Sequence, residues 1–188
     1  MRTSAGRVKL TYDDFVRFPD DGKRHELIDG EHFVTPSPST RHQRICGNLH
    51  LLIGNWLELH PIGQVFFAPF DVVFSHFDIV EPDLLYLSSE RAAVALTSAH
   101  VRGVPELVVE VGSPGTQKRD TTIKRHLYER SGVSEYWFID ADRDVVRVYR
   151  RSGQEFAPAV VLTIAAADVL TTPLLPGLDM PLTRVFKM

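Results

Sequence analysis

The sequence predicts an α/β domain in which a mixed central β-sheet is flanked by helices. Short segments rich in β-branched and aromatic residues alternate with longer segments whose apolar residues recur at helical spacing. Such interleaving is typical of strands and helices packed around one sheet. The chain has 188 residues, of which 44% are hydrophobic, enough for one domain over residues 1–188 with a substantial core.

The first third of the chain predicts a short helix, a hairpin and a long helix. The short helix covers residues 11–16, where a hydroxyl residue precedes two acids and then Phe and Val. Asp29-Gly30 separates two short apolar runs and favours a type I′ turn, so we expect a tight hairpin around it. The long helix runs over 40–60, capped by Ser39 or Thr40, with its apolar residues at helical spacing.

The remaining two thirds predict mainly strands. Residues 64–68, 71–74 and 84–87 are expected to be successive strands of one sheet, whereas 88–104 permits a short helix or an ordered loop. A helix is expected to end just before Gly132, which occupies the C′ position. The other expected elements are a strand at 106–111, a turn at 112–116, the helix itself at 117–131, strands at 136–139 and 145–150, an edge strand at 159–164 and an extended closing segment.

Composition narrows the class of protein. No stretch approaches the roughly 20 apolar residues of a membrane helix, and residues 1–6 lack the apolar core of a signal peptide, so we expect a cytoplasmic protein with no membrane partner. The lone Cys46 excludes an internal disulfide and a cysteine-cluster metal site. A net charge of -3 does not indicate a polyanionic partner, although residues 117–130 carry five Lys or Arg against two acids.

Two apolar runs, 80–84 and 107–111, each carry a carboxylate in what otherwise resembles a buried strand: Asp83 and Glu110. Burying an ionised carboxylate costs several kcal/mol unless a cation or hydrogen bonds compensate it. Two carboxylates on neighbouring strands therefore suggest a divalent metal between them. Hard oxygen ligands, completed by the backbone carbonyl of Val111, favour Mg²⁺ or Mn²⁺ over zinc.

Lys124 is the candidate cation for this site. It lies on the helix that follows the second carboxylate strand, where Asp120 and Tyr128 share its face at i, i+4 spacing. Its ammonium group could fold back over the metal, position the attacking water and balance charge in the transition state of phosphate transfer. The combination predicts hydrolysis of phosphodiester bonds.

These motifs, taken in order, resemble the Uma2 (DUF820) family of restriction-endonuclease-like proteins. The resemblance covers roughly residues 11–150, and the ordered combination is more specific than any one motif. It rests on His25–Glu31, Pro36–Pro38, His42–Arg44, Pro82–Leu84, Glu110–Pro114, Asp120, Lys124, Tyr128 and Gly132–Trp137.

The resemblance implies the PD-(D/E)XK nuclease fold, a Mg²⁺- or Mn²⁺-dependent endonuclease activity expected to act on DNA, and a homodimer. It makes Asp83 and Glu110 the metal ligands, adds Glu26 as a further acid, and places His42 near a phosphate or a water of the metal. The superfamily carries its lysine two residues after the second acid. Here that position is Gly112, so the lysine role passes to Lys124.

Other interpretations remain open. An inactive protein with the nuclease fold could serve as a DNA-binding or dimerisation module, whereas a cupin-like metalloprotein is disfavoured because the histidines lack paired ligand spacing. Asp83 could hydrogen-bond a turn, Glu110 could pair with Arg102, and Lys124 could form an ordinary surface pair with Asp120. The aromatic residues Tyr136 and Trp137 are expected to be core residues.

Overall fold

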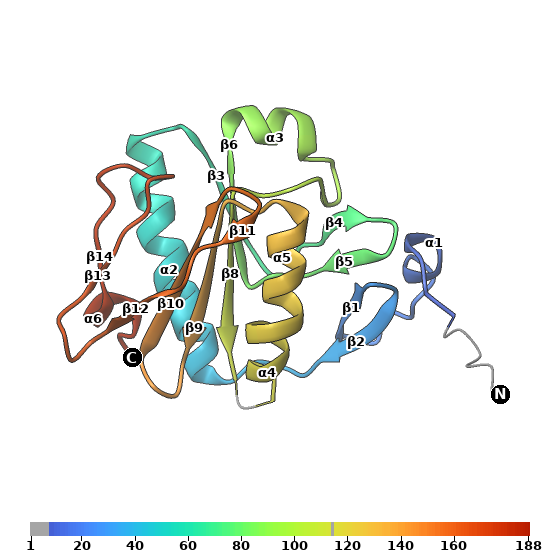
Figure 1. Cartoon of the computed structure of the whole chain (residues 1–188), viewed down its shortest axis with the longest axis horizontal. Coiled ribbons are helices and arrows are strands. Elements are labelled where there is room, and N and C mark those ends of the chain that lie inside the picture. Colours follow the sequence, from blue (N-terminus) through green and yellow to red (C-terminus); the bar gives the residue numbers. More distant parts are fainter. Residues whose placement is uncertain (1–7, 114) are drawn as a thin grey trace.

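Two larger β-sheets, a two-stranded sheet of β13 and β14, and the helices packed on them make up the described residues 8–113 and 115–188 of the computed structural model (Figure 1). The first residues of the chain, where no signal peptide is expected, lie outside the described residues. So does residue 114 within the predicted turn at 112–116. The architecture is mixed α/β with helices flanking the sheets, as the sequence predicts.

The larger sheet forms the centre of the molecule. Among the described residues it runs in the order β11-β10-β9-β8-β6-β3, and β12 pairs with β10. The neighbours β8 and β9 are parallel, the remaining pairs are antiparallel, and β12 confirms the expected edge strand. The strands are β3 (Gly63–Phe67), β6 (Leu84–Ser88), β8 (Leu107–Gly112), β9 (Glu135–Asp140), β10 (Val145–Ser152), β11 (Glu155–Phe156) and β12 (Val160–Thr163).

Helices cover both faces of this sheet (Figure 1). One face carries α2 (Thr40–Leu59), which Ser39 caps by accepting the N–H of His42. The other carries a continuous helical segment made of α4 (Gln117–Arg119), the π-helical turn η1 (Asp120–Lys124) and α5 (Arg125–Ser131), followed by Gly132 in the left-handed conformation. Both long helices are confirmed. The sequence pattern did not reveal the π-helical turn.

Side chains along the central strands alternate between the two faces of the sheet. This alternation explains which core cluster each residue joins and which face Glu110 lies on. Leu107, Val109 and Val111 pack in the cluster beneath α2, whereas Val108 packs beneath α5. Because successive side chains point to opposite faces of a strand, Glu110 faces the same side as Val108. The expected core residues Tyr136 and Trp137 are fully buried.

The smaller sheet corrects one expectation. It runs in the order β2-β1-β5-β4-β7, so residues 71–74 belong to it and not to the sheet of β3 and β6. The local pattern predicted a strand correctly but could not identify its partner, because the β4–β5 turn lacks glycine and proline. The predicted hairpin is confirmed, with positive φ at both Asp29 and Gly30. Its strands are β1 (Arg24–Ile28) and β2 (Glu31–Thr35), and the others are β4 (Val72–Ser75), β5 (Asp78–Val80) and β7 (Val101–Arg102).

Short elements complete the chain. The predicted short helix is α1 (Tyr12–Phe15), and α3 (Ser89–Ala95) settles the choice left open for 88–104. The closing segment contributes β13 (Val169–Leu170), β14 (Met180–Pro181) and α6 (Leu182–Val185). None of the helices described here combines the length and apolar character needed to cross a membrane.

Gly112 is the last residue of β8 and packs against a buried aromatic ring. Only glycine fits at this position, because a side chain would overlap the ring. A Cβ at Gly112 would lie 2.5 Å from Cζ of Phe138, which is fully buried. We expect Gly112→Ala to lower the free energy of unfolding by about 1–3 kcal/mol, because the ring has no room to retreat. Urea denaturation measures this change.

Gly47 provides the matched control for that substitution. It lies within α2, and a Cβ there would meet nothing within 4 Å. Gly47→Ala should therefore raise the free energy of unfolding by about 0.5–1 kcal/mol. If Gly112→Ala were as stable as Gly47→Ala, the close packing of Phe138 against β8 would be wrong.

Candidate active site

A small cavity of about 40 Å³ lies where β1, β8, α2 and η1 come together. This volume has room for an ion and a few waters. The position of each residue in its element brings it to the cavity. Arg24 begins β1, and residues 81–83 lead into β6. Glu110 faces the α5 side of β8, and His42 lies in the first turn of α2. The charged groups lining the cavity are Arg24, His42, Glu81, Asp83, Glu110, Arg119, Asp120 and Lys124, and Glu26 lies directly behind Lys124.

Asp83 is held by three donors. Arg24 Nη1 lies 2.9 Å from Oδ1, while His42 Nε2 lies 3.0 Å and the Val111 N–H 2.8 Å from Oδ2. Burial alone would raise the pKa of Asp83, but His42, Arg24 and the backbone donor outweigh burial and lower the pKa to about 2. Asp83 is therefore a carboxylate at neutral pH, and its interactions are specific to this cavity and not those of a local turn.

Glu110 and Glu26 share the ammonium group of Lys124. Nζ lies 2.9 Å from Glu110 Oε1 and 2.7 Å from Glu26 Oε1, and the Tyr128 hydroxyl also donates to Glu110 Oε1. Burial raises the pKa of Glu110 to about 8, although Lys124 opposes the shift. Burial alone would lower the pKa of Lys124, but the two carboxylates outweigh burial and raise it. Lys124 is thus a buried, fully charged ammonium.

This arrangement answers two of the open interpretations. Lys124 and Asp120 are both buried in η1, each about 2% exposed, so they do not form a surface pair. Arg102 stacks on the ring of Tyr12, with Cζ 5.0 Å from the ring centroid, and Glu110 takes its charge partner from Lys124 instead.

The structure also explains why the lysine does not occupy position 112. Residues 110 and 112 point to the same face of β8, and the ring of Phe138 fills the space that a side chain at Gly112 would need. The helix that follows β8 supplies the cation instead. Lys124 reaches back from η1 to Glu110, which is the geometry expected of a displaced lysine.

Arg24, Glu81 and Arg119 line the cavity but were not identified as site residues from the sequence. Asp120 was identified only as a residue on the same helix face as Lys124. Arg24 bridges the acids through Nη1 to Asp83 and through Nε, 3.3 Å from Glu81 Oε1. Burial raises the pKa of Glu81 to about 7, against the opposing effect of Arg24. The second carboxylate in the run Glu81-Pro82-Asp83 was the available signal for Glu81. Arg24 had no comparable signal, since it begins an ordinary hairpin strand.

The basic residues of 117–130 do not all face solvent. The side chain of Arg119 turns inward, donating to Thr35 Oγ1 at 2.8 Å and lying 3.6 Å from Glu26 Oε2. Lys118, by contrast, is exposed.

Carboxyl groups outnumber cations around the cavity. Among the described residues, five carboxyl groups (Glu26, Glu81, Asp83, Glu110 and Asp120) face three permanent cations (Arg24, Arg119 and Lys124). Glu26 Oε2, Glu81 Oε1 and Asp120 Oδ1 form no hydrogen bond within the described part of the chain, although arginine nitrogens lie 3.3 to 3.8 Å from them. Burial raises the pKa of Glu81 to about 7 and that of Glu110 to about 8, so full ionisation of the five acids at neutral pH needs further positive charge. A divalent cation would supply that charge.

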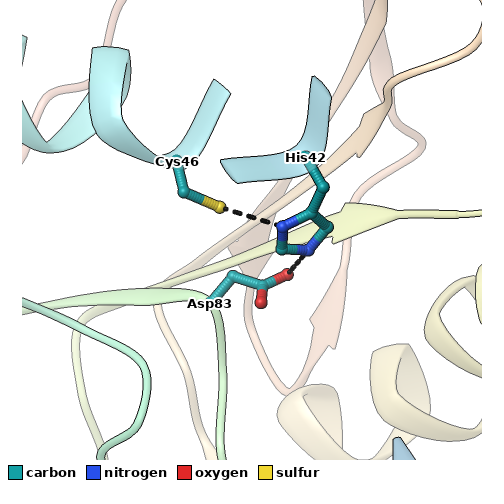
Figure 2. A group of neighbouring side chains, drawn as sticks. All are labelled: His42, Cys46 and Asp83. Atoms are coloured by element: carbon teal, nitrogen blue, oxygen red, sulfur yellow. Dashed lines mark hydrogen bonds and ion pairs between the residues drawn. The ribbon is translucent and has the colours of Figure 1, made fainter. Parts of the chain in front are cut away.

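Two donor sets near this cavity could hold a metal. Asp83, Glu110 and Val111 line it together, and their oxygens suit Mg²⁺ or Mn²⁺. A second group, His42, Cys46 and Asp83, brings its donor atoms within 4.8 Å of one another (Figure 2). Cys46 and Asp83 approach opposite nitrogens of the His42 ring, with Sγ 3.6 Å from Nδ1. These three form a hydrogen-bonded chain, whereas ligation of one ion would require the ring to rotate.

Cys46 offers a soft sulfur ligand. Burial raises the pKa of its thiol, with the nearby Asp83 acting in the same direction. Because Mg²⁺ and Mn²⁺ prefer oxygen ligands, the oxygen donor set suits these ions better than the group containing sulfur. The hard-ion preference inferred from the sequence is consistent with this donor chemistry.

Comparison with known proteins agrees with the fold and identifies the family. The sequence profile of the Uma2 family, described as "Putative restriction endonuclease", matches residues 12–183. A crystal structure of a putative nuclease belonging to DUF820 from Anabaena variabilis ATCC 29413 superposes with a TM-score of 0.79 at 20% identity, covering 94% of this chain and 97% of that one. No curated protein matches the sequence significantly. The family match spans nearly the whole chain, and the chain belongs to the Uma2 family.

Proposed function

We propose that this protein is a nuclease that hydrolyses phosphodiester bonds of DNA with the help of Mg²⁺ or Mn²⁺. The observation that carries the proposal is the excess of buried carboxyl groups over cations around the cavity, with Lys124 lying between two of them. Membership of a family described as "Putative restriction endonuclease" supports the nuclease chemistry. The DNA substrate, the metal, the homodimer and the cytoplasmic location stay predictions.

Asp83, Glu110 and the carbonyl of Val111 are the proposed ligands. Asp83 is already ionised. Arg24 now contacts its Oδ1, and a bound metal ion would take the place of Arg24 there or leave Arg24 free to turn toward the substrate. A divalent ion bound there would polarise the scissile phosphate and make the attacking water more acidic. The neighbouring Glu81 has an oxygen, Oε1, that forms no hydrogen bond within the described chain and has Arg24 Nε 3.3 Å away.

Lys124 is the proposed catalytic cation. Its raised pKa keeps the ammonium charged, so it can hold the attacking water and offset the negative charge that develops on the phosphate. Glu26 contacts Lys124 but does not line the cavity, which supports a positioning role for Glu26. His42 orients Asp83 through Nε2, and a small movement of its ring would let it contact a phosphate oxygen.

One observation favours the inactive alternative. Arg24 and Lys124 already provide partners for Asp83 and Glu110, so the two principal acids are satisfied without a metal. A nuclease-fold protein that acts only as a binding or dimerisation module would need nothing more from this cavity. Metal binding therefore decides between the two functions.

Isothermal titration with Mn²⁺ tests the proposed ligands. We expect Asp83→Asn and Glu110→Gln to weaken Mn²⁺ binding roughly 100-fold or more, because each removes a charged ligand. Glu135→Gln is the matched control, since Glu135 is an equally buried acid that contacts Trp137 and Thr172 outside the cavity. Cys46→Ser should bind Mn²⁺ like the wild type.

Two results would overturn the ligand assignment. Wild-type affinity in Asp83→Asn would remove this carboxylate from the site. A loss in Cys46→Ser without a loss in Glu110→Gln would instead indicate that His42, Cys46 and Asp83 hold the ion.

Cleavage of DNA tests the role of Lys124. Supercoiled and single-stranded DNA are incubated with the protein in Mg²⁺, Mn²⁺ or EDTA. We expect cleavage that depends on the metal and falls about 10²- to 10³-fold in Lys124→Met, because a charged donor to the transition state is lost. Mn²⁺ affinity should persist in Lys124→Met, which separates a catalytic defect from a folding defect. No cleavage by the wild type, together with no Mn²⁺ binding, would favour the inactive module.

A further inference from the structure

A second hollow continues from the cavity on the far side of His42 and Asp83. Its volume is about 470 Å³, and it shares Arg24, His42, Glu81 and Asp83 with the first cavity as lining residues. Volumes in this range accommodate small organic ligands. Any substrate whose phosphate reached the proposed metal ligands would therefore have this hollow beside it.

The wall of the hollow combines charged and apolar residues. Besides the charged groups shared with the cavity it contains Asp20 and Lys23, and the Lys23 side chain is 61% exposed. Its apolar part includes Phe67, Ala68 and Pro69. A nucleotide combines the same two kinds of group, because a charged phosphate is followed by a flat base with apolar faces.

Phe67 supplies an aromatic ring, here called the platform, in the apolar part of this wall. Its side chain is 56% exposed although it lies in a paired strand, where β3 places Phe67 opposite Leu84 of β6. The ring contacts His50 edge to face, with centroids 4.6 Å apart. Directly after Phe67, the Ala68 N–H donates to the Asp83 carbonyl at 3.1 Å. Backbone pairing thus fixes the platform relative to Asp83.

We propose that this hollow binds the nucleotide next to the scissile phosphate, with its base unpaired and stacked on Phe67. The inference rests on the proposed nuclease function and adds a substrate class to it: single-stranded DNA, or DNA that is locally unpaired at the cleavage position. In a continuous duplex the faces of each base are covered by its neighbours, and only the base edges are open to a protein. An aromatic platform beside the scissile position is therefore useful only for an unpaired base.

Gln43 gives the hollow one group able to form hydrogen bonds with a base edge. It lies on α2 one residue after His42 and lines the same hollow. Stacking tolerates every base, because each has an aromatic face. Recognition here should accordingly be broad in sequence, with Gln43 adding at most a modest preference.

Fluorescence anisotropy tests this inference independently of cleavage. The probes are a fluorescein-labelled single-stranded DNA of twelve nucleotides and a hairpin duplex with the same labelled strand, measured in Ca²⁺. We expect the single strand to bind the wild type more tightly than the hairpin. Phe67→Ala should weaken single-strand binding about tenfold, because base stacking on an aromatic ring is lost, and Phe67→Trp should restore it.

Phe77→Ala is the matched control for Phe67→Ala. Phe77 is an exposed phenylalanine at 38%, and its ring lies near Lys9, whereas it does not line the hollow. This variant should bind both probes like the wild type. Because Phe67 is more than half exposed, Phe67→Ala should also keep the unfolding temperature of the wild type.

The outcomes separate the inference from the nuclease proposal. Equal single-strand binding by Phe67→Ala and the wild type overturns the inference, and so does tighter binding of the hairpin. If the wild type then still cleaves DNA in a metal-dependent manner, the nuclease function stands without this substrate class. If single-strand binding depends on Phe67 but no DNA is cleaved with any metal, the hollow is a binding site and the proposed catalysis fails.

Discussion

The buried ammonium of Lys124 is the interaction on which the site depends. It lies between Glu26 of β1 and Glu110 of β8, within 3 Å of both. Removing three charged groups from water costs many kcal/mol, and only their mutual attraction and further hydrogen bonds offset that cost. Lys124 therefore links β1 of the smaller sheet to β8 of the larger sheet beside the cavity.

The pairing of Lys124 with Glu26 and Glu110 leaves few cations for the other carboxyl groups of the cavity. Once Glu26 and Glu110 are paired with Lys124, the carboxylates of Glu81, Asp83 and Asp120 have only Arg24 and Arg119 as permanent cations nearby, among the residues described. Burial raises the pKa values of Glu81 and Glu110, and the nearby cations offset this effect only in part. A fold selected for stability alone gains little from such a cluster, since apolar residues of similar volume often serve as well. The cluster is better explained by a ligand that brings positive charge.

Much of the fold was predictable because its elements have strong local patterns. The hairpin, both long helices and the central strands followed from turn residues and apolar periodicity. The partner of β4 was not predictable, since pairing with β5 depends on contacts between Val73 and Ile79 that no local pattern encodes. Asp83, Glu110 and Lys124 stood out as charges within apolar or helical patterns. Arg24 did not, because its role arises only when the smaller sheet pairs β1 with β5, the strand that precedes Asp83.

A crystal structure of the wild-type protein grown with Mn²⁺ tests the central claim most directly, because the anomalous scattering of manganese locates the ion without reference to activity. We expect one anomalous peak in contact with the carboxylates of Asp83 and Glu110, with Lys124 still beside Glu110. Two results would contradict it: a peak held by His42 and Cys46, or no peak in the cavity at Mn²⁺ concentrations far above those of a functional site.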